Sequence, residues 1–243
     1  DRPLSRGLGD VYKRQDYLEL SADHDFAKFV ESGCMIYRTE ENGYLDTIIN
    51  RAKELNIPFE LWGPNDIKSN LPIVDVHKYA PVKAPSDSQF GTHENQLLKG
   101  AIFFPTAGYV NDPKLSAYNL QIASEEKGGK FLFNKEVVSI IKKDKRAAGV
   151  ELSDGSKIHS KVVINVAGPH SMKINQMADV EKEMNIKTKA LKVEVSHVSS
   201  PANFDYEADA FVVSDGDIGC YIRPETGNHI LIGSEDPECD ERI

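Results

Sequence analysis

The segment Lys161–Ser171, KVVINVAGPHS, constrains the fold of this chain more than any other stretch. Residues 162–166 form a nearly continuous apolar run, which is typical of a strand buried on both faces of a parallel sheet. Ala167-Gly168-Pro169 then ends the run. Small residues at the carboxyl end of such a strand allow another backbone, or a phosphate, to approach closely. The same residues also fit a buried strand that ends in an ordinary turn.

The sequence around this segment predicts an α/β layer crossed by a β-meander. Asp112 is placed as a helix N-cap with Pro113 at the first helical position, and Gly128-Gly129 indicates the end of that helix. Asp154-Gly155 is typical of a hairpin turn. From hydrophobic periodicity we expect helices at 16–32, 43–56, 65–70, 114–127 and 171–178, strands at 33–38, 59–62, 100–104 and 130–133, and a meander at 136–142, 148–152 and 157–160. The inner face of the helix 114–127 is predicted to carry Leu115, Tyr118, Ile122 and Ala123.

The C-terminal part of the chain predicts a second sheet. Strands are expected at 188–198, 210–214, 219–223 and 229–233. Because no helix is expected between the last three, the sheet is predicted to be antiparallel and to form a second domain. The polar stretch 73–99 is predicted to be irregular, and no role is assigned to its histidine, His93.

Composition excludes several classes of function. The 243 residues have a net charge of −9, which argues against binding to nucleic acid or to an anionic membrane surface. No apolar run approaches the roughly 20 residues needed to span a bilayer. The three cysteines are scattered along the chain and suggest neither a disulfide framework nor a metal site. We therefore expect no metal, and a protein of a reducing, cytoplasmic compartment.

The two ends of the chain are interpreted separately. Residues 1–15, DRPLSRGLGDVYKRQ, show no helical or strand period and look like translated adapter sequence, so we leave them out of the fold. A genuine basic arm is the alternative. Since residues 239–243 also complete no element, we expect the chain to be a fragment of a longer protein.

Four segments together carry a resemblance to a known family. They are GYVNDPKLSA at 108–117, FLFNKEVVSI at 131–140, GVELSDGSKIHSKVVINVAGPHS at 149–171 and CYIRPETGNHILIG at 220–233. In this order they resemble the D-amino-acid-oxidase-like superfamily of FAD-dependent oxidoreductases, within it the group of sarcosine oxidase, dimethylglycine dehydrogenase and glycine oxidase. The likeness covers about 33–233.

The resemblance implies an α/β fold with an α+β second domain. A partial, Rossmann-like FAD-binding domain with a β-meander would comprise 16–32 and 106–180, and an antiparallel-sheet substrate domain would comprise 33–105 and 181–243. One departure is important: the strand, G-x-G-x-x-G turn and helix that hold the FAD pyrophosphate in this family are missing from the sequence. We therefore expect these 243 residues by themselves to bind FAD weakly and to be inactive.

The resemblance also implies residues that bind FAD. The strand at Val137 and Val138 would offer backbone groups to the adenine. Ala167 and Gly168 match small residues beside the adenosine and pyrophosphate, where a side chain would collide with the cofactor. The next two positions, Pro169 and His170, complete the predicted cofactor site. His170 departs from the family pattern, and a surface histidine at a helix start is the alternative.

In this family the second sheet covers the flavin ring, which places Tyr221 and Arg223 in the predicted catalytic site. Strand alternation puts both side chains on one face. A hydroxyl and a guanidinium on that face could hold a substrate carboxylate, with the arginine as a bidentate fork. The alternative is a surface tyrosine and an arginine held in a salt bridge.

The resemblance implies oxidation of a small amine or amino acid, of the sarcosine or dimethylglycine type, by hydride transfer to FAD. The electrons would pass to oxygen or to an acceptor protein, and the flavin would carry the redox chemistry. A protein of another class remains as the alternative: a non-catalytic dinucleotide-binding subunit or module of a larger oxidoreductase complex.

Overall fold

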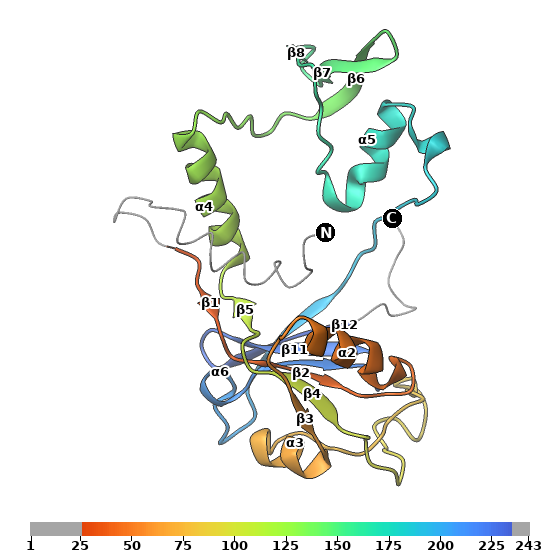
Figure 1. The fold of residues 1–243 in the computed structure, drawn as a ribbon, viewed down its shortest axis with the longest axis vertical. Coiled ribbons are helices and arrows are strands. Elements are labelled where there is room, and N and C mark those ends of the chain that lie inside the picture. The colour runs from red at the N-terminus through yellow and green to blue at the C-terminus, as the bar shows by residue number, and fades with distance from the viewer. Residues whose placement is uncertain (1–25, 235–243) are drawn as a thin grey trace. The chain divides into compact units, whose positions relative to one another are not determined.

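The computed structural model describes residues 26–234, which divide into two compact units (Figure 1). The large unit comprises 26–127 and 194–234, and the small unit comprises 128–193. The chain therefore leaves the large unit once and returns to it. The expected helix at 16–32 is wrong over its described part, because 26–32 contain the short strand β1 (Phe29–Val30). Residues 16–25, and the adapter-like segment 1–15, lie outside the described residues.

A seven-stranded sheet forms the centre of the large unit, in the order β3-β4-β2-β10-β11-β12-β9. All neighbours are antiparallel except β2 and β10, which pair in parallel with Val213 opposite Met35. The predicted strands are confirmed, although the one expected at 188–198 begins only at Val195. The strands are β2 (Cys34–Tyr37), β3 (Glu60–Trp62), β4 (Ala101–Phe104), β9 (Val195–Ser199), β10 (Val212–Asp215), β11 (Cys220–Glu225) and β12 (His229–Ser234).

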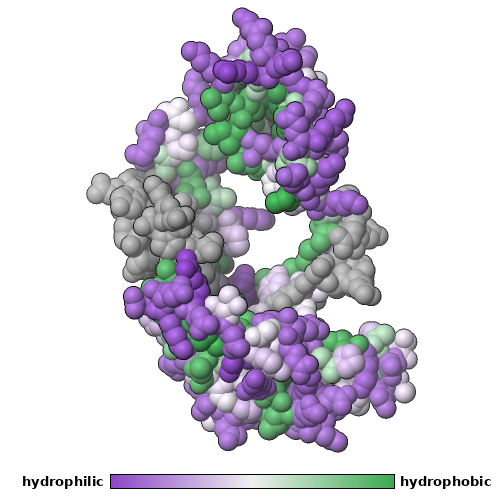
Figure 2. Space-filling view, turned by 45° about the vertical axis from the view of Figure 1, so that its right-hand side comes forward, coloured by the Kyte–Doolittle hydropathy of each residue, from purple (hydrophilic) through white to green (hydrophobic). Residues whose placement is uncertain are grey.

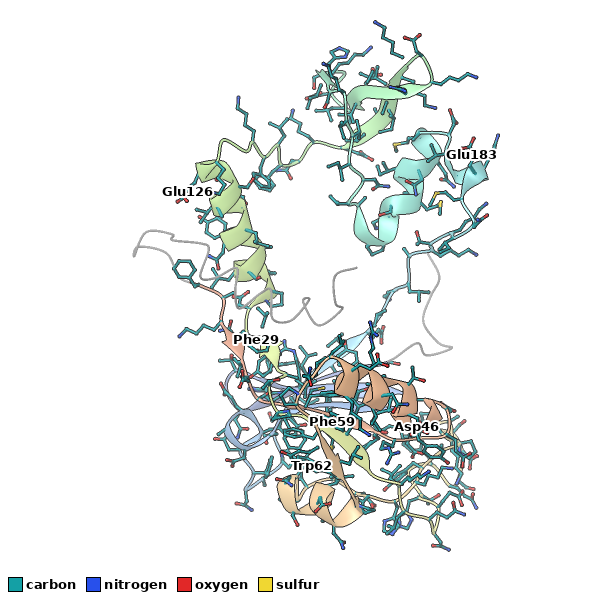
Figure 3. All side chains as sticks on the ribbon, in the orientation of Figure 1. Phe29, Asp46, Phe59, Trp62, Glu126 and Glu183 are labelled. Atoms are coloured by element: carbon teal, nitrogen blue, oxygen red, sulfur yellow. The ribbon has the colours of Figure 1, made fainter. Side chains whose placement is uncertain are left out.

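The main core of the large unit lies against this sheet. Met35, Ile67 and Tyr206 are fully buried in it. At its edge Trp62, the last residue of the edge strand β3, stacks on Phe103 with ring centroids 4.2 Å apart (Figure 3). Strand alternation produces this core, because every second residue of β2 and β10 points to the same side.

The helices of the large unit follow their predicted signals except α6, which the sequence analysis did not predict. They are η1 (Gly43–Leu45), α2 (Asp46–Glu54), α3 (Pro64–Asn70), α4 (Pro113–Glu126) and α6 (Tyr206–Asp209). The N-cap prediction for α4 is confirmed, since the Asp112 carboxylate accepts a hydrogen bond of 2.9 Å from the amide of Leu115. The predicted inner face is wrong at Tyr118, which is exposed. Asn119 is buried instead, where its side-chain oxygen accepts from the amide of Ala27 at 3.0 Å.

The small unit contains the predicted meander. Its strands β6 (Val137–Lys143), β7 (Arg146–Leu152) and β8 (Lys157–His159) form an antiparallel sheet in chain order. Gly149 is required in β7, because an added Cβ would lie 2.2 Å from the carbonyl oxygen of Ile158. The short helices η2 (Gly168–His170), α5 (Ser171–Met177) and η3 (Glu181–Glu183) follow, and α5 matches the predicted helix.

Two predicted strands of the small unit are wrong. Residues 130–133 and 162–166 form no strand, and their apolar side chains are largely exposed, with Val166 at 85%. Hydrophobic atoms are visible at the surface of this unit, at the top of Figure 2. An apolar run becomes a buried strand only where neighbouring strands and side chains cover it. Within 26–234 none pairs with either run. No helix in the described part of the chain is long and apolar enough to cross a bilayer.

We predict that Ile102→Ala destabilises the large unit by about 2–5 kcal/mol, because Ile102 is fully buried and truncation leaves a cavity. The matched control is Leu61→Ala at its cross-strand partner, which is 52% exposed and should cost much less. Urea unfolding followed by the fluorescence of Trp62, the single tryptophan, measures this unit. Equal losses for the two variants would contradict the packing described here.

Candidate functional site

Arg223 lies on β11 with its guanidinium largely buried and already paired. Its Nη2 donates to the Glu225 carboxylate at 2.7 Å, and Nη1 donates to the carbonyl of Pro224 at 3.0 Å. The side chain of Arg223 is 16% exposed. The salt bridge considered as the alternative is therefore present. A substrate carboxylate at this site would compete with Glu225 or use the remaining N–H donors of the guanidinium.

An aromatic ring that the sequence did not single out completes this face. The Arg223 guanidinium lies over the ring of Tyr109, 5.0 Å from its centroid. Tyr109 belongs to β5 (Tyr109–Val110), which pairs with β1. Burial raises the pKa of Tyr109, nearby Glu207 and Glu225 raise it further, and Arg223 opposes them, so the hydroxyl stays protonated at neutral pH. The turn before the N-cap Asp112 was the only sequence signal for this residue.

Tyr221 lies flat across the neighbouring strand. Its cross-strand partner is Gly233, where an added Cβ would come within 2.2 Å of the Tyr221 ring. A glycine at this position is therefore what allows the ring to cover β12. Tyr221 and Arg223 share the large unit and one face of β11, as alternation predicts.

The opposite face of β11 borders a separate hollow of about 370 Å³. Cys220 and Ile222 line it, whereas Tyr221 and Arg223 do not. The other lining residues are apolar or acidic, with His77 and tyrosines among them: Tyr37, Val74, Asp75, His77, Tyr79, Leu98, Val213, Asp215, Asp217, Ile218 and Ile232. We call this the acidic hollow. Sequence reasoning missed it, because its walls come from β2, β10, β11, β12 and the irregular segment 73–99.

The predicted cofactor residues all belong to the small unit. Val137 is half-buried and Val138 exposed, at the start of β6 where the pairing with β7 is irregular. Within the described residues β6 pairs only with β7, so its other edge is open. An open strand edge carries backbone donors and acceptors. These groups fit the edge of a purine, which is what FAD would present.

Residues 167–170 form the second part of the predicted cofactor site. Gly168 has a positive φ of 57°, and an added Cβ there would meet no atom within 4 Å, so the backbone is accessible. Ala167 lies just before it, and its amide donates to Asn165 at 3.1 Å. Pro169 and His170 line a hollow of about 370 Å³ beside α5. Residues 167–170 therefore leave room for a cofactor to approach the protein backbone closely.

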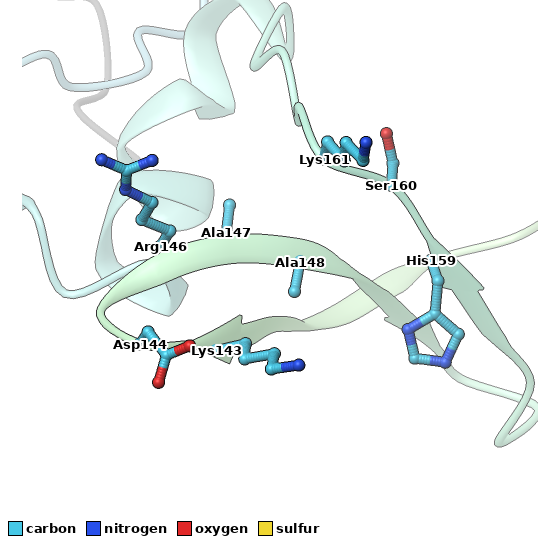
Figure 4. A pocket seen from close by; sticks show the side chains of 8 residues that line it. All are labelled: Lys143, Asp144, Arg146, Ala147, Ala148, His159, Ser160 and Lys161. Atoms are coloured by element: carbon cyan, nitrogen blue, oxygen red, sulfur yellow. The ribbon is translucent and has the colours of Figure 1, made fainter.

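A further hollow of the small unit contains none of the predicted residues. It measures about 710 Å³ and is lined by the hairpin tip and β8, with Lys143, Arg146 and Lys161 supplying positive charge and Asp144 negative charge (Figure 4). Its side chains are mostly exposed, so their charge is screened by solvent. We assign it no role.

Comparison with known proteins identifies the family of the chain. Residues 10–242 match the family described as DAO, FAD dependent oxidoreductase. Because the match covers most of the chain, the chain belongs to this family, whose cofactor is FAD. No curated protein matches the chain.

Solved structures show the same fold. L-proline dehydrogenase from P. horikoshii superposes with a TM-score of 0.70 at 18% identity, covering 93% of this chain and 53% of that chain. For glycine oxidase from Geobacillus kaustophilus the TM-score is 0.67 at 20% identity, with 98% and 54% covered. Iminodiacetate oxidase from Chelativorans sp. BNC1 gives 0.63 at 18% identity, with 98% and 55% covered. The chain thus spans about half the length of these structures.

We predict that Gly233→Ala destabilises the large unit by about 1–3 kcal/mol, because the new methyl group collides with the Tyr221 ring. In a Tyr221→Ala background the same substitution should cost almost nothing, since the collision is removed. Gly216→Ala is the control, because its added Cβ would lie no closer than 3.4 Å to another residue. Urea unfolding gives the coupling energy, and additive effects would show that the two residues do not touch.

Proposed function

We propose that the chain contributes the substrate-binding sheet and part of the adenosine site of an FAD-dependent enzyme that oxidises a secondary or tertiary amine or an amino acid. The observation that carries the proposal is the family match over residues 10–242. The chemistry that FAD supplies is the acceptance of a hydride from the carbon next to the substrate nitrogen. N-methylated glycines, the sarcosine and dimethylglycine type, are the proposed substrate class.

In this proposal the large unit binds the substrate. Arg223 anchors its carboxylate, and the Tyr221 hydroxyl adds a hydrogen bond from the same face. The low exposure of Arg223 supports this role, because an ion pair shielded from water is stronger than one at the surface. Glu225 keeps the guanidinium compensated until a substrate carboxylate takes part of its hydrogen bonding. The ring of Tyr109 stabilises the guanidinium through a cation–π contact.

The small unit binds the adenosine half of FAD in this proposal. The open edge of β6 at Val137 and Val138 faces the adenine, and Ala167 and Gly168 let the cofactor approach the backbone. Pro169 and His170 follow at the start of α5. The absence of bulky side chains at 167–168 supports the assignment, because a ligand can approach the backbone closely only where no large side chain occupies the space.

We predict that Arg223→Ala in the complete protein raises KM for a carboxylate-bearing amine about 10- to 100-fold with a smaller change in kcat, because a charged hydrogen bond to the substrate is lost. Glu225→Gln, which frees the guanidinium, should leave KM unchanged or lower it. Arg51→Ala, which removes an exposed salt bridge elsewhere in the large unit, is the control. Steady-state kinetics give KM and kcat for each variant. Equal KM increases for the Arg223 and Glu225 variants would assign the ion pair a structural role.

We further predict that Ala167→Leu lowers the affinity of the complete protein for FAD about tenfold or more, because its side chain would fill the space of the cofactor. The neighbouring substitution Val166→Leu changes an exposed side chain and should leave flavin affinity unchanged. Titration of the apoprotein with FAD, followed by flavin fluorescence, gives both constants. Equal affinities of the two variants would remove Ala167 from the cofactor site.

The alternative is a dinucleotide-binding module without turnover. The salt bridge of Arg223 is compatible with it, since the arginine then needs no substrate. A complete protein that binds FAD but whose flavin is not reduced by amines or amino acids under anaerobic conditions would favour this alternative. Reduction by an N-methylated glycine favours the enzyme.

A further inference from the structure

Three potential metal ligands converge in the irregular segment 73–99 of the large unit. Asp75, His77 and His93 each offer one ligand atom, and these atoms all lie within 4.8 Å of one another. The imidazole rings of His77 and His93 are stacked, with centroids 4.1 Å apart and planes 16° apart. Backbone pairing brings them together: His77 forms a bridge with Leu97, and Lys78 bonds to Gln96 and Glu94.

Each of the two rings makes a short contact through its Nδ1 atom. The Nδ1 atom of His93 lies 2.7 Å from the carbonyl oxygen of Glu94. Because a carbonyl only accepts, Nδ1 carries the proton and Nε2 keeps its lone pair. Nδ1 of His77 lies 2.6 Å from the Asp75 carboxylate, so these two atoms are close enough to bind one ion in place of their hydrogen bond. A histidine whose second nitrogen donates to a carbonyl or a carboxylate is the common arrangement around protein-bound metals.

The carboxylate of Asp75 retains room for one more partner. Its Oδ1 accepts from the backbone and the ring of His77, and its Oδ2 accepts from the Tyr79 hydroxyl at 2.9 Å. Each carboxylate oxygen has two acceptor sites, so one site on Oδ2 remains.

The surroundings favour a cation. Asp75 and His77 line the acidic hollow, to which Asp215 and Asp217 add two more carboxylates and no lysine or arginine contributes. Asp217 is only 6% exposed. Its Oδ2 accepts from the amides of Tyr79 and Ala80, but its Oδ1 has no hydrogen-bond partner. An uncompensated buried carboxylate oxygen makes the local potential negative and attracts positive charge.

We propose that Asp75, His77 and His93 bind one divalent transition-metal ion, for which Zn²⁺ is the best match. Two imidazole nitrogens and one carboxylate oxygen are a ligand set that Zn²⁺ accepts, with water in the fourth position. Ca²⁺ and Mg²⁺ prefer sets made entirely of oxygen and should bind poorly. The site lies on the opposite side of β11 from Tyr221 and Arg223, so it is separate from the proposed substrate site. It also replaces the expectation from the sequence that the protein has no metal.

A second histidine pair provides a matched control. His197 and His229 are stacked in much the same way, with centroids 4.5 Å apart and planes 15° apart. Within 26–234, however, Asp75, His77 and His93 form a group of three close ligand atoms, whereas no such group includes His197 or His229. Stacking alone therefore does not make a site, and a third ligand distinguishes the two pairs.

The test measures Zn²⁺ binding to the complete, metal-stripped protein by isothermal titration calorimetry at pH 7.5. We expect one site at micromolar or tighter affinity, weakened about tenfold or more by His93→Ala, by His77→Ala and by Asp75→Asn. His197→Ala should bind like the wild type. Trp62 fluorescence confirms that each variant is folded, and His93→Gln provides a milder replacement if His93→Ala does not fold.

Several outcomes would overturn the proposal. They are a wild-type protein that binds no Zn²⁺ at about 100 µM, a folded His93 variant that binds as tightly as the wild type, and a site lost in His197→Ala instead. Displacement of Zn²⁺ by an equal concentration of Ca²⁺ would also contradict it, because an imidazole-containing site should discriminate against that ion.

Discussion

The parallel pairing of β2 with β10 is the interaction on which the large unit depends. It joins residues near 35 to residues near 213, so the two stretches of chain that form this unit share one sheet and one core. Met35 and Val213 meet across this pair and are fully buried. The long-range pairing is costly in chain entropy, and it is offset only because it buries the aromatic and aliphatic residues around it together. Because β11 pairs with β10, the positions of the side chains on β11 depend on this parallel pair as well.

The two faces of strand β11 carry different chemical groups. On one face of β11 lie the Arg223–Glu225 ion pair, the Tyr221 ring and, beside the guanidinium, the ring of Tyr109. On the other face Cys220 and Ile222 border the acidic hollow with its carboxylates and His77, whose ring stacks on His93. Because successive side chains of a strand point to opposite faces, a shift by one residue would exchange the two environments. The register with β12, fixed by Tyr221 opposite Gly233, therefore matters for both proposed sites.

The exposed apolar run at 162–166 shows that a local hydrophobic pattern is not enough to predict a buried strand. Its composition is that of a strand with neighbours on both sides, yet within 26–234 no strand pairs with it. Such a strand exists only as part of a sheet, since an unpaired backbone and an uncovered apolar side chain gain nothing from the extended form.

By itself the sequence determined what depends on neighbours along the chain: the N-cap of α4 at Asp112, the meander with its Asp154-Gly155 turn, and the alternation that places Tyr221 and Arg223 on one face. The family resemblance was also present in the sequence, because it rests on four motifs in a fixed order. Only the tertiary structure decided which partners those elements meet. The pairing of Arg223 with Glu225, the burial of Asn119 in place of Tyr118, and the stacking of His77 on His93 all join residues through folded backbone. Such contacts depend on long-range register and packing, which cannot be predicted from the hydrophobic periodicity of a local stretch of sequence.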